Sequence, residues 1–328
     1  MLKEIAHIAF IFISVWFLLI IIGGIIFFHM SMIRYFNTIK RASKSKEKES
    51  ALNSYLKNPS IIIPLQEAKE RWFQKIDKNV FERLTVLTRK KLQLIGYYCK
   101  ANSPLSAKTV ILIHGIKDSS AGMAYLYEEY NILGWNVLSI DLRSHGESDG
   151  KKITMGVTEI EDIELWVNTL ITLFNAREIY LHGVSMGGAV ALMYAGGTKK
   201  IPFEVKGLIS DCSYARYDRI VRRFLNLFLG NGFLAWSLYV GASFVCFINT
   251  GIPYFRMNPE KSLQNIKIPV LLFHGEKDEV VPLSLAEQMI DKARAQGFKV
   301  VVVPDAPHIG AYFYLKKEYI ENIIAFSL

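Results

Sequence analysis

The stretch EIYLHGVSMGGAVALMYAG, residues 178–196, decides the fold of this chain. It opens with a β-favouring apolar run at residues 178–182 and closes with small apolar residues that favour a helix. Between these runs, Ser185 stands in a G-x-S-x-G spacing. That spacing is typical of a sharp strand-to-helix turn, in which the glycines remove side chains that would crowd an exposed serine hydroxyl. We therefore predict that Ser185 is a nucleophile at the start of a helix.

Short apolar runs occur before and after this turn, with helical patterns such as residues 159–174 and 283–296 between them. Only three residues separate the first two runs, which predicts an antiparallel hairpin, whereas the later Val/Ile/Leu-rich runs indicate strands buried on both faces. The pattern predicts an α/β fold with a mostly parallel eight-stranded sheet covered by helices. The predicted strands occupy residues 82–88, 92–100, 109–115, 136–143, 178–185, 205–211, 269–275 and 299–305.

Two later strands are each followed by a residue that suits the activation of a serine. Asp278 comes after the strand at residues 269–275, and His308 comes after the last strand. Sites in open α/β sheets form beyond the carboxyl ends of the strands, and the order serine, acid, histidine is the one this architecture requires. Histidine titrates near neutrality and can take the serine proton, while a carboxylate holds its tautomer. The residues predict acyl transfer to Ser185 followed by hydrolysis.

Other aspartates compete for the role of the acid. Asp211 also ends a strand, and Asp305 lies three residues before His308. We favour Asp278 because its strand directly precedes the strand of the histidine. For Asp211 we expect a structural role, and Asp141 is expected to order the loop that follows its own strand.

Six motifs in chain order resemble the α/β-hydrolase superfamily, and more closely its bacterial serine hydrolases with an N-terminal membrane anchor. The resemblance covers about residues 65–328 and implies the α/β-hydrolase fold, but it says much less about the substrate. The motifs are HGIKDSS (114–120), DLRSHGES (141–148), GVSMGG (183–188), SDCSY (210–214), HGEKDEVVP (274–282) and APH (306–308).

The resemblance also implies roles for individual residues. Ser185 is then the nucleophile, His308 the general base and Asp278 the orienting acid. The backbone N–H groups of Ile116 and Met186 are implied as the oxyanion hole.

Two positions depart from the family pattern. Relatives often carry glycine or alanine at the position of Ser144, and often a serine shortly after the catalytic histidine, where this chain has IGAYFY. We expect the loop to tolerate the first change and the wall of the pocket to differ because of the second.

No compact histidine motif, dinucleotide-binding glycine pattern or P-loop occurs in the sequence. The three cysteines, Cys99, Cys212 and Cys246, are widely spaced, which argues against a zinc site and a disulfide framework. We therefore predict neither a metal nor a cofactor.

The N-terminal region has the composition of a membrane anchor. Residues 5–33 contain no Asp, Glu, Lys or Arg over 29 positions, and about 20 apolar residues suffice to cross a bilayer. The exit FFHMSM is a poor cleavage site for a signal peptide. We predict a retained single-pass transmembrane anchor over residues 1–33.

The net charge of +9 over 328 residues is concentrated beside this anchor. Residues 34–57 carry seven Lys or Arg against two Glu, a net +5, which is more than half of the excess. That pattern indicates a membrane-proximal segment rather than a nucleic-acid groove. The positive-inside rule then places the bulk of the chain in the cytoplasm at the cell membrane. We predict a basic juxtamembrane linker over residues 34–64, then a hydrolase domain over residues 65–328 that starts with an amphipathic helix at 65–78.

A helical lid is predicted at residues 212–262, between the sixth and seventh strands. Residues 224–255 contain no charged residue, but glycine, asparagine and proline interrupt them, which favours lid helices over a second spanning helix. We expect these helices to pack over the site, and a sharper hypothesis is that they form an acyl-chain pocket or dip into the bilayer. Arg219, Arg222 and Arg223 share a helical face that suits anionic headgroups or solvent equally well.

The leading functional prediction is a membrane-anchored serine hydrolase that cleaves carboxylic esters or thioesters, with lipid-like acyl compounds among the small-molecule substrates. The alternatives are a serine aminopeptidase-like peptidase and a catalytically idle scaffold at the membrane.

Overall fold

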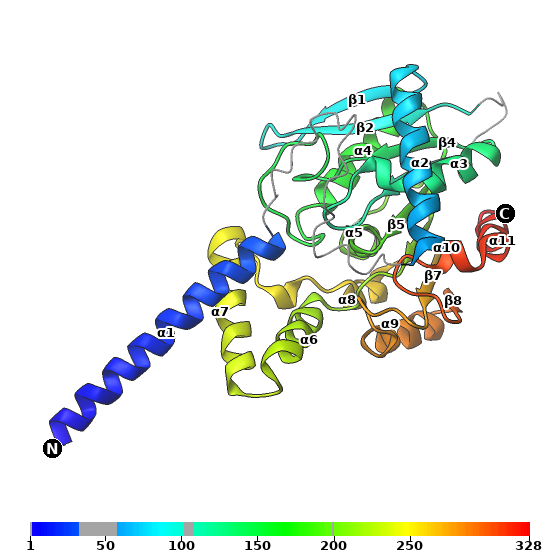
Figure 1. Cartoon of the computed structure of the whole chain (residues 1–328). Helices are drawn as coiled ribbons and strands as arrows, with labels where there is room; N and C mark the ends of the chain where they lie inside the picture. The colour runs from blue at the N-terminus through cyan, green and yellow to red at the C-terminus, as the bar shows by residue number, and fades with distance from the viewer. Residues whose placement is uncertain (1, 33–57, 102–107, 199) are drawn as a thin grey trace.

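The computed structural model describes residues 2–32, 58–101, 108–198 and 200–328 (Figure 1). Its sheet has eight strands in the order β1-β2-β4-β3-β5-β6-β7-β8. The strand β2 runs antiparallel to β1 and β4, and every other neighbouring pair is parallel, so the predicted hairpin and mostly parallel sheet are confirmed. The strands are β1 (Glu82–Leu87), β2 (Gln93–Cys99), β3 (Lys108–Ile113), β4 (Asn136–Ile140), β5 (Glu178–Val184), β6 (Val205–Asp211), β7 (Val270–Gly275) and β8 (Lys299–Val303).

Two apolar clusters lie on opposite faces of the sheet. In β3, Ile111 and Ile113 join one cluster, while Val110 and Leu112 join the other. A strand alternates its side chains between faces, so both faces of β3 are buried, as its continuous apolar run predicts. Helices α4 (Ile160–Leu173), α5 (Met186–Gly197) and α9 (Leu283–Ala295) supply the first cluster, and α2 (Pro59–Asp77), α3 (Ala124–Ile132) and α11 (Lys316–Phe326) supply the second.

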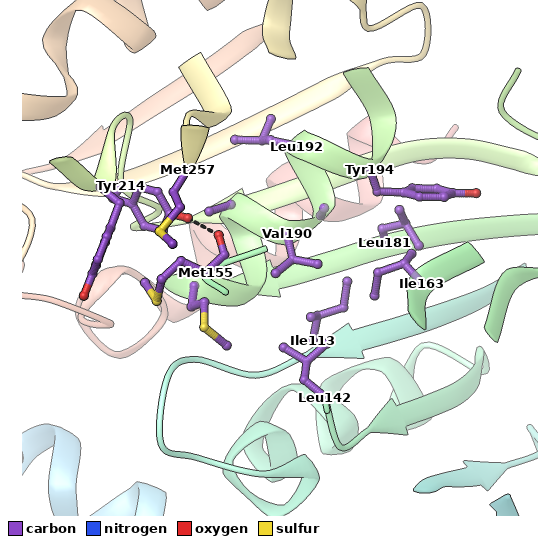
Figure 2. Close-up of a cluster of buried hydrophobic side chains, with 14 of the residues drawn as sticks. Ile113, Leu142, Met155, Ile163, Leu181, Val190, Leu192, Tyr194, Tyr214 and Met257 are labelled. Atoms are coloured by element: carbon purple, nitrogen blue, oxygen red, sulfur yellow. Dashed lines mark hydrogen bonds between the residues drawn. The ribbon is translucent and has the colours of Figure 1, made fainter. Parts of the chain in front are cut away.

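Figure 2 shows part of the first cluster, where Val190 of α5 lies among Ile113, Ile163 and Leu181. All four side chains are fully buried. This packing holds the start of α5 against the carboxyl ends of β3 and β5, which is where the G-x-S-x-G turn lies. Shorter helices are η2 (Ser120–Met123), η3 (Tyr254–Arg256), α8 (Pro259–Ser262), η4 (Leu263–Asn265) and α10 (Ala311–Tyr314).

The helix α2 begins earlier than the sequence indicates. The prediction places a linker up to residue 64 and a helix over residues 65–78, but the helix starts at Pro59. Asn58 caps it, since its side chain accepts a hydrogen bond from the N–H of Ser60 at 3.0 Å, and proline is favoured in the first helical turn. The basic residues 34–57 of the predicted linker lie outside the described residues.

The helix α1 (Leu2–Met32) is long and apolar enough to cross a membrane, with a mean hydropathy of 2.3 over Ser14–Met32. Its C-terminal end is built into the rest of the protein. Phe28 and Met32 are buried, and the N–H of Ile153 donates a hydrogen bond to the carbonyl of Met32 at 2.8 Å. The predicted anchor therefore contacts the hydrolase fold directly, which the sequence did not indicate.

The insertion before β7 folds into two helices, α6 (Tyr217–Leu229) and α7 (Phe233–Thr250). They form a hairpin whose turn spans residues 230–232, so the predicted break at these glycines is confirmed. The main partner of α7 is α1, beside which it lies, rather than the strand ends that carry the candidate site (Figure 1). By length and composition α7 also qualifies as a candidate membrane span.

Candidate active site

Ser185 occupies a strained turn between β5 and α5. Its φ of 55° and ψ of −117° lie in a region that non-glycine residues rarely adopt. A Cβ atom on Gly183 would lie 2.2 Å from the carbonyl carbon of Gly187, and one on Gly187 would lie 2.0 Å from the carbonyl oxygen of Ile113. Only glycine fits at either position, which is the role that the sequence predicts for both.

The three predicted catalytic side chains form one hydrogen-bonded chain. Nε2 of His308 lies 2.9 Å from Oγ of Ser185, and Nδ1 of His308 lies 2.7 Å from Oδ2 of Asp278. Oδ1 of Asp278 accepts hydrogen bonds from the N–H groups of Val280 and Val281, at 2.9 and 2.7 Å. The carboxylate is thus fixed in position and favours the Nδ1–H tautomer, which leaves Nε2 able to accept the serine proton.

The two backbone amides assigned to the oxyanion hole lie at the ends of β3 and β5. Met186 is the first residue of α5, so its N–H has no partner within the helix. Ile116 follows Gly115, and a Cβ atom on Gly115 would lie 3.5 Å from Cβ of Ser185, which places this loop against the nucleophile. In the described part of the chain, neither amide donates a backbone hydrogen bond outside the regular elements. Both amides are therefore available to an oxyanion.

The structure distinguishes between the aspartates that compete for the role of the orienting acid. Oδ2 of Asp211 accepts a hydrogen bond from the hydroxyl of Tyr319 at 2.9 Å, and burial raises the pKa of this carboxyl to about 7. Asp305 is exposed and pairs with Lys277. Because Asp278 is the aspartate that contacts the His308 ring, the geometry supports it as the orienting acid.

Asp141 orders the loop after β4, as the sequence predicts. Its carboxylate accepts hydrogen bonds from the N–H groups of Ser120 and Glu147, both at 2.7 Å. In the same loop Ser144 has a φ of 65°. That left-handed conformation favours glycine, so the serine is strained there.

Cys212 is a neighbour of the site that the sequence analysis did not assign to it. Its Sγ lies 4.0 Å from Nε2 of His308, and the signal available in the sequence was its place directly after Asp211 at a strand end. Cys212, Asp278 and His308 also bring their donor atoms close enough to hold a metal ion. However, burial raises the pKa of the Cys212 thiol, which disfavours the thiolate that binds metals, and the other two residues already bond to each other. These residues therefore fit an orienting pair beside a serine better than a metal centre.

Comparisons with known proteins agree with this architecture. The family model for serine aminopeptidase, S33, matches residues 105–239, and the model for the prolyl oligopeptidase family matches residues 224–328. The esterase Pf2001 of Pyrococcus furiosus has a similar structure, with a TM-score of 0.61 and 23% identity, covering 77% of this chain and 92% of that one.

Two further proteins are similar to this chain in sequence. The uncharacterized protein YqkD of Bacillus subtilis is 28% identical over 223 residues, covering 68% of this chain and 70% of that protein. The lysophosphatidylserine lipase ABHD12 of Danio rerio is 24% identical over 231 residues, covering 67% of this chain and 58% of that protein.

The fold, the strained serine turn and these matches define a serine hydrolase of the α/β type. The chain belongs to the α/β-hydrolase superfamily.

Proposed function

We propose that this protein hydrolyses carboxylic esters or thioesters with Ser185 as the nucleophile, His308 as the general base and Asp278 as the orienting acid. The observation that carries the proposal is the continuous chain from Oγ of Ser185 through the His308 ring to Asp278, at 2.9 and 2.7 Å. A serine hydroxyl is a weak nucleophile unless a positioned base takes its proton.

The proposed reaction has two halves. His308 takes the proton of Ser185 as Oγ attacks the substrate carbonyl, and the N–H groups of Met186 and Ile116 stabilise the oxyanion. The imidazolium then gives its proton to the departing alcohol or thiol, which leaves an acyl group on Oγ. Water, deprotonated by His308, releases the carboxylic acid and restores the serine. The positive end of the α5 dipole adds to the stabilisation of the oxyanion.

Labelling with a fluorophosphonate probe tests this proposal. We expect the full-length protein to be labelled and the Ser185→Ala variant to remain unlabelled. If the folded parent protein did not react, the scaffold hypothesis would replace the enzymatic one.

A peptidase is the second candidate, because the matching family models describe peptidase families. A panel of acyl esters, acyl thioesters and aminoacyl amides separates the candidates. Values of kcat/KM that are highest for the esters or thioesters support the proposal, whereas values that are highest for the amides favour the peptidase.

We also infer that α1 anchors the enzyme to the cell membrane, with the catalytic domain facing the cytoplasm. The support is the apolar length of α1 and the basic residues 34–57 that follow it. The match to a lysophosphatidylserine lipase favours lipid-derived acyl compounds as the substrate class. Protease treatment of intact cells should leave the domain whole, and its removal would contradict this orientation.

A further inference from the structure

The α6–α7 hairpin exposes apolar side chains that soluble proteins usually bury. Its tip is the most exposed part, with Phe228 at 72% and Phe233 at 69% of full exposure. Large exposed apolar patches mark a surface that contacts a membrane or another protein. The exposed members at and near the tip are Phe224, Leu227, Phe228, Leu229, Phe233, Leu234 and Trp236, and farther from the tip along α7 are Val240, Phe244, Phe247 and Ile248.

This surface is continuous with the lipid-facing candidate surface of α1. The ring of Trp16 stacks on the ring of Phe233 at 5.8 Å, and Gly24 meets Gly241 so closely that a Cβ atom on Gly24 would lie 2.8 Å from the Gly241 carbonyl carbon. Both contacts share one register, so the two helices run in the same direction. Close approach at glycines is how helices pack where lipid surrounds them.

Residues typical of a membrane interface lie on both helices of the hairpin, farther from its tip. Arg222 lies over the ring of Tyr239, with its Cζ atom 5.9 Å from the ring centroid. Together with Trp236 and Asn226 they line a hollow of about 290 Å³ between α6 and α7. Arginine, tryptophan and tyrosine are enriched where the headgroups of a bilayer meet its acyl chains.

We propose that the tip of the α6–α7 hairpin inserts into the same bilayer as α1, with Arg222 and the neighbouring Arg223 at the level of anionic phospholipid headgroups. The partner of this surface is therefore a lipid bilayer. The inference rests on the membrane anchor of the proposed function, and it extends that anchor from one helix to a three-helix attachment.

The register between α1 and α7 sets the depth of insertion. Tyr239, beside Arg222, lies at the level of Ile22, and Phe233 lies at the level of Trp16. At a rise of 1.5 Å per residue along α7, the tip lies at most about 9 Å deeper than the arginine. This depth is typical of a segment that enters one leaflet without crossing it.

The arrangement gives the hairpin a function in substrate supply. The chain enters the hairpin after β6 and leaves it before β7, the strand that precedes Asp278. A hairpin fixed in the leaflet holds this side of the hydrolase fold at the membrane surface, where lipid-derived acyl compounds are concentrated.

The test compares three full-length variants, each with one introduced cysteine carrying an environment-sensitive fluorophore. The described native cysteines are all buried, so the unsubstituted protein measures background labelling. Phe228→Cys probes the hairpin tip, Phe17→Cys probes α1, and Phe203→Cys is the matched control, since Phe203 is 85% exposed on the hydrolase fold. The proteins are reconstituted in vesicles of phosphatidylcholine and phosphatidylglycerol that contain nitroxide-labelled acyl chains.

We expect the labels at 228 and 17 to lose fluorescence with nitroxide lipid and to resist aqueous iodide, and the label at 203 to do the opposite. Iodide quenching at 228 that matches quenching at 203 would overturn the inference, whether or not the label at 17 is protected. Fluorophosphonate labelling of Ser185 in each variant checks that the fold is intact. Since that reaction does not report depth, failure of the hydrolase proposal and failure of the hairpin proposal remain distinguishable.

Discussion

Oγ of Ser185 lies 2.9 Å from Nε2 of His308, although 123 residues separate them in the chain. The strained turn at Ser185 and the loop after β8 meet at the same edge of the sheet because β5 and β8 both point their carboxyl ends there. This contact brings the two segments together in one candidate catalytic site.

The identity of the acid is tested by a matched pair of variants. We expect Asp278→Asn to lower kcat by about 10⁴-fold, because the amide favours the wrong tautomer of His308. Asp211→Asn is the control, and its kcat should change by less than about tenfold, since Asp211 bonds to Tyr319 rather than to His308. Steady-state kinetics on an ester substrate measure both. A larger loss in Asp211→Asn than in Asp278→Asn would reassign the acid.

The turn itself is tested at two glycines of α5. A Cβ atom on Gly187 would lie 2.0 Å from the carbonyl oxygen of Ile113, whereas one on Gly197 would meet nothing within 4 Å. We expect Gly187→Ala to lower the free energy of unfolding by about 3 kcal/mol or more, because the backbone must shift. Gly197→Ala should be neutral or stabilising by up to about 1 kcal/mol. Denaturant unfolding of the two variants in detergent measures this difference. Equal losses of unfolding free energy would contradict the conclusion that only glycine fits at position 187.

The contact between α1 and α7 is tested at Gly241. A Cβ atom there would lie 2.3 Å from Cγ2 and 2.8 Å from the carbonyl oxygen of Ile20. We expect Gly241→Val to separate the helices and to cost about 1–3 kcal/mol of stability. Gly232→Ala is the control in the same hairpin, because a Cβ atom at Gly232 meets nothing within 4 Å. Thermal unfolding in detergent should show a clear decrease in Tm for the first variant alone.

Stability should fall in mild acid because of buried histidines. Burial lowers the pKa of His182 to about 3, while an unfolded histidine titrates near 6.5. The folded pKa is the lower one, so the unfolded state binds the proton first. The stabilisation is complete above about pH 6.5 and is lost as the pH falls towards 3, at up to about 1.4 kcal/mol per pH unit.

The variant His182→Gln isolates this effect. Glutamine retains hydrogen-bonding capacity towards Tyr130 and Tyr319, the two hydroxyls that contact the ring, but carries no titratable group. Between pH 4 and 6, the slope of the unfolding free energy against pH should decrease by about 1.4 kcal/mol per pH unit, which corresponds to one proton. An unchanged slope would show that His182 is not the group responsible. The slope is compared because the substitution also changes absolute stability.

Much of the site could be predicted because its signals are local. The G-x-S-x-G spacing reports a turn that only glycines permit at positions 183 and 187, and the Val/Ile/Leu runs report strands that are buried on both faces. The start of α2 was missed because it depends on a cap: Asn58 and Pro59 begin the helix before its amphipathic pattern becomes visible. Cys212 was missed because its distance from His308 depends on the paths of β6 and β8.

The sequence by itself determined the class of fold, the order of Ser185, Asp278 and His308, and an apolar N-terminal helix, since each depends on neighbouring residues or on their order. Tertiary structure alone decided that α7 packs along α1, and it supplied the contact between the imidazole and Asp278, the acid that the strand order favours. The physical reason is the range of the interactions. Propensity and hydrophobic periodicity act within a few residues, but a 2.7 Å contact between loops depends on how the entire sheet and its helices pack.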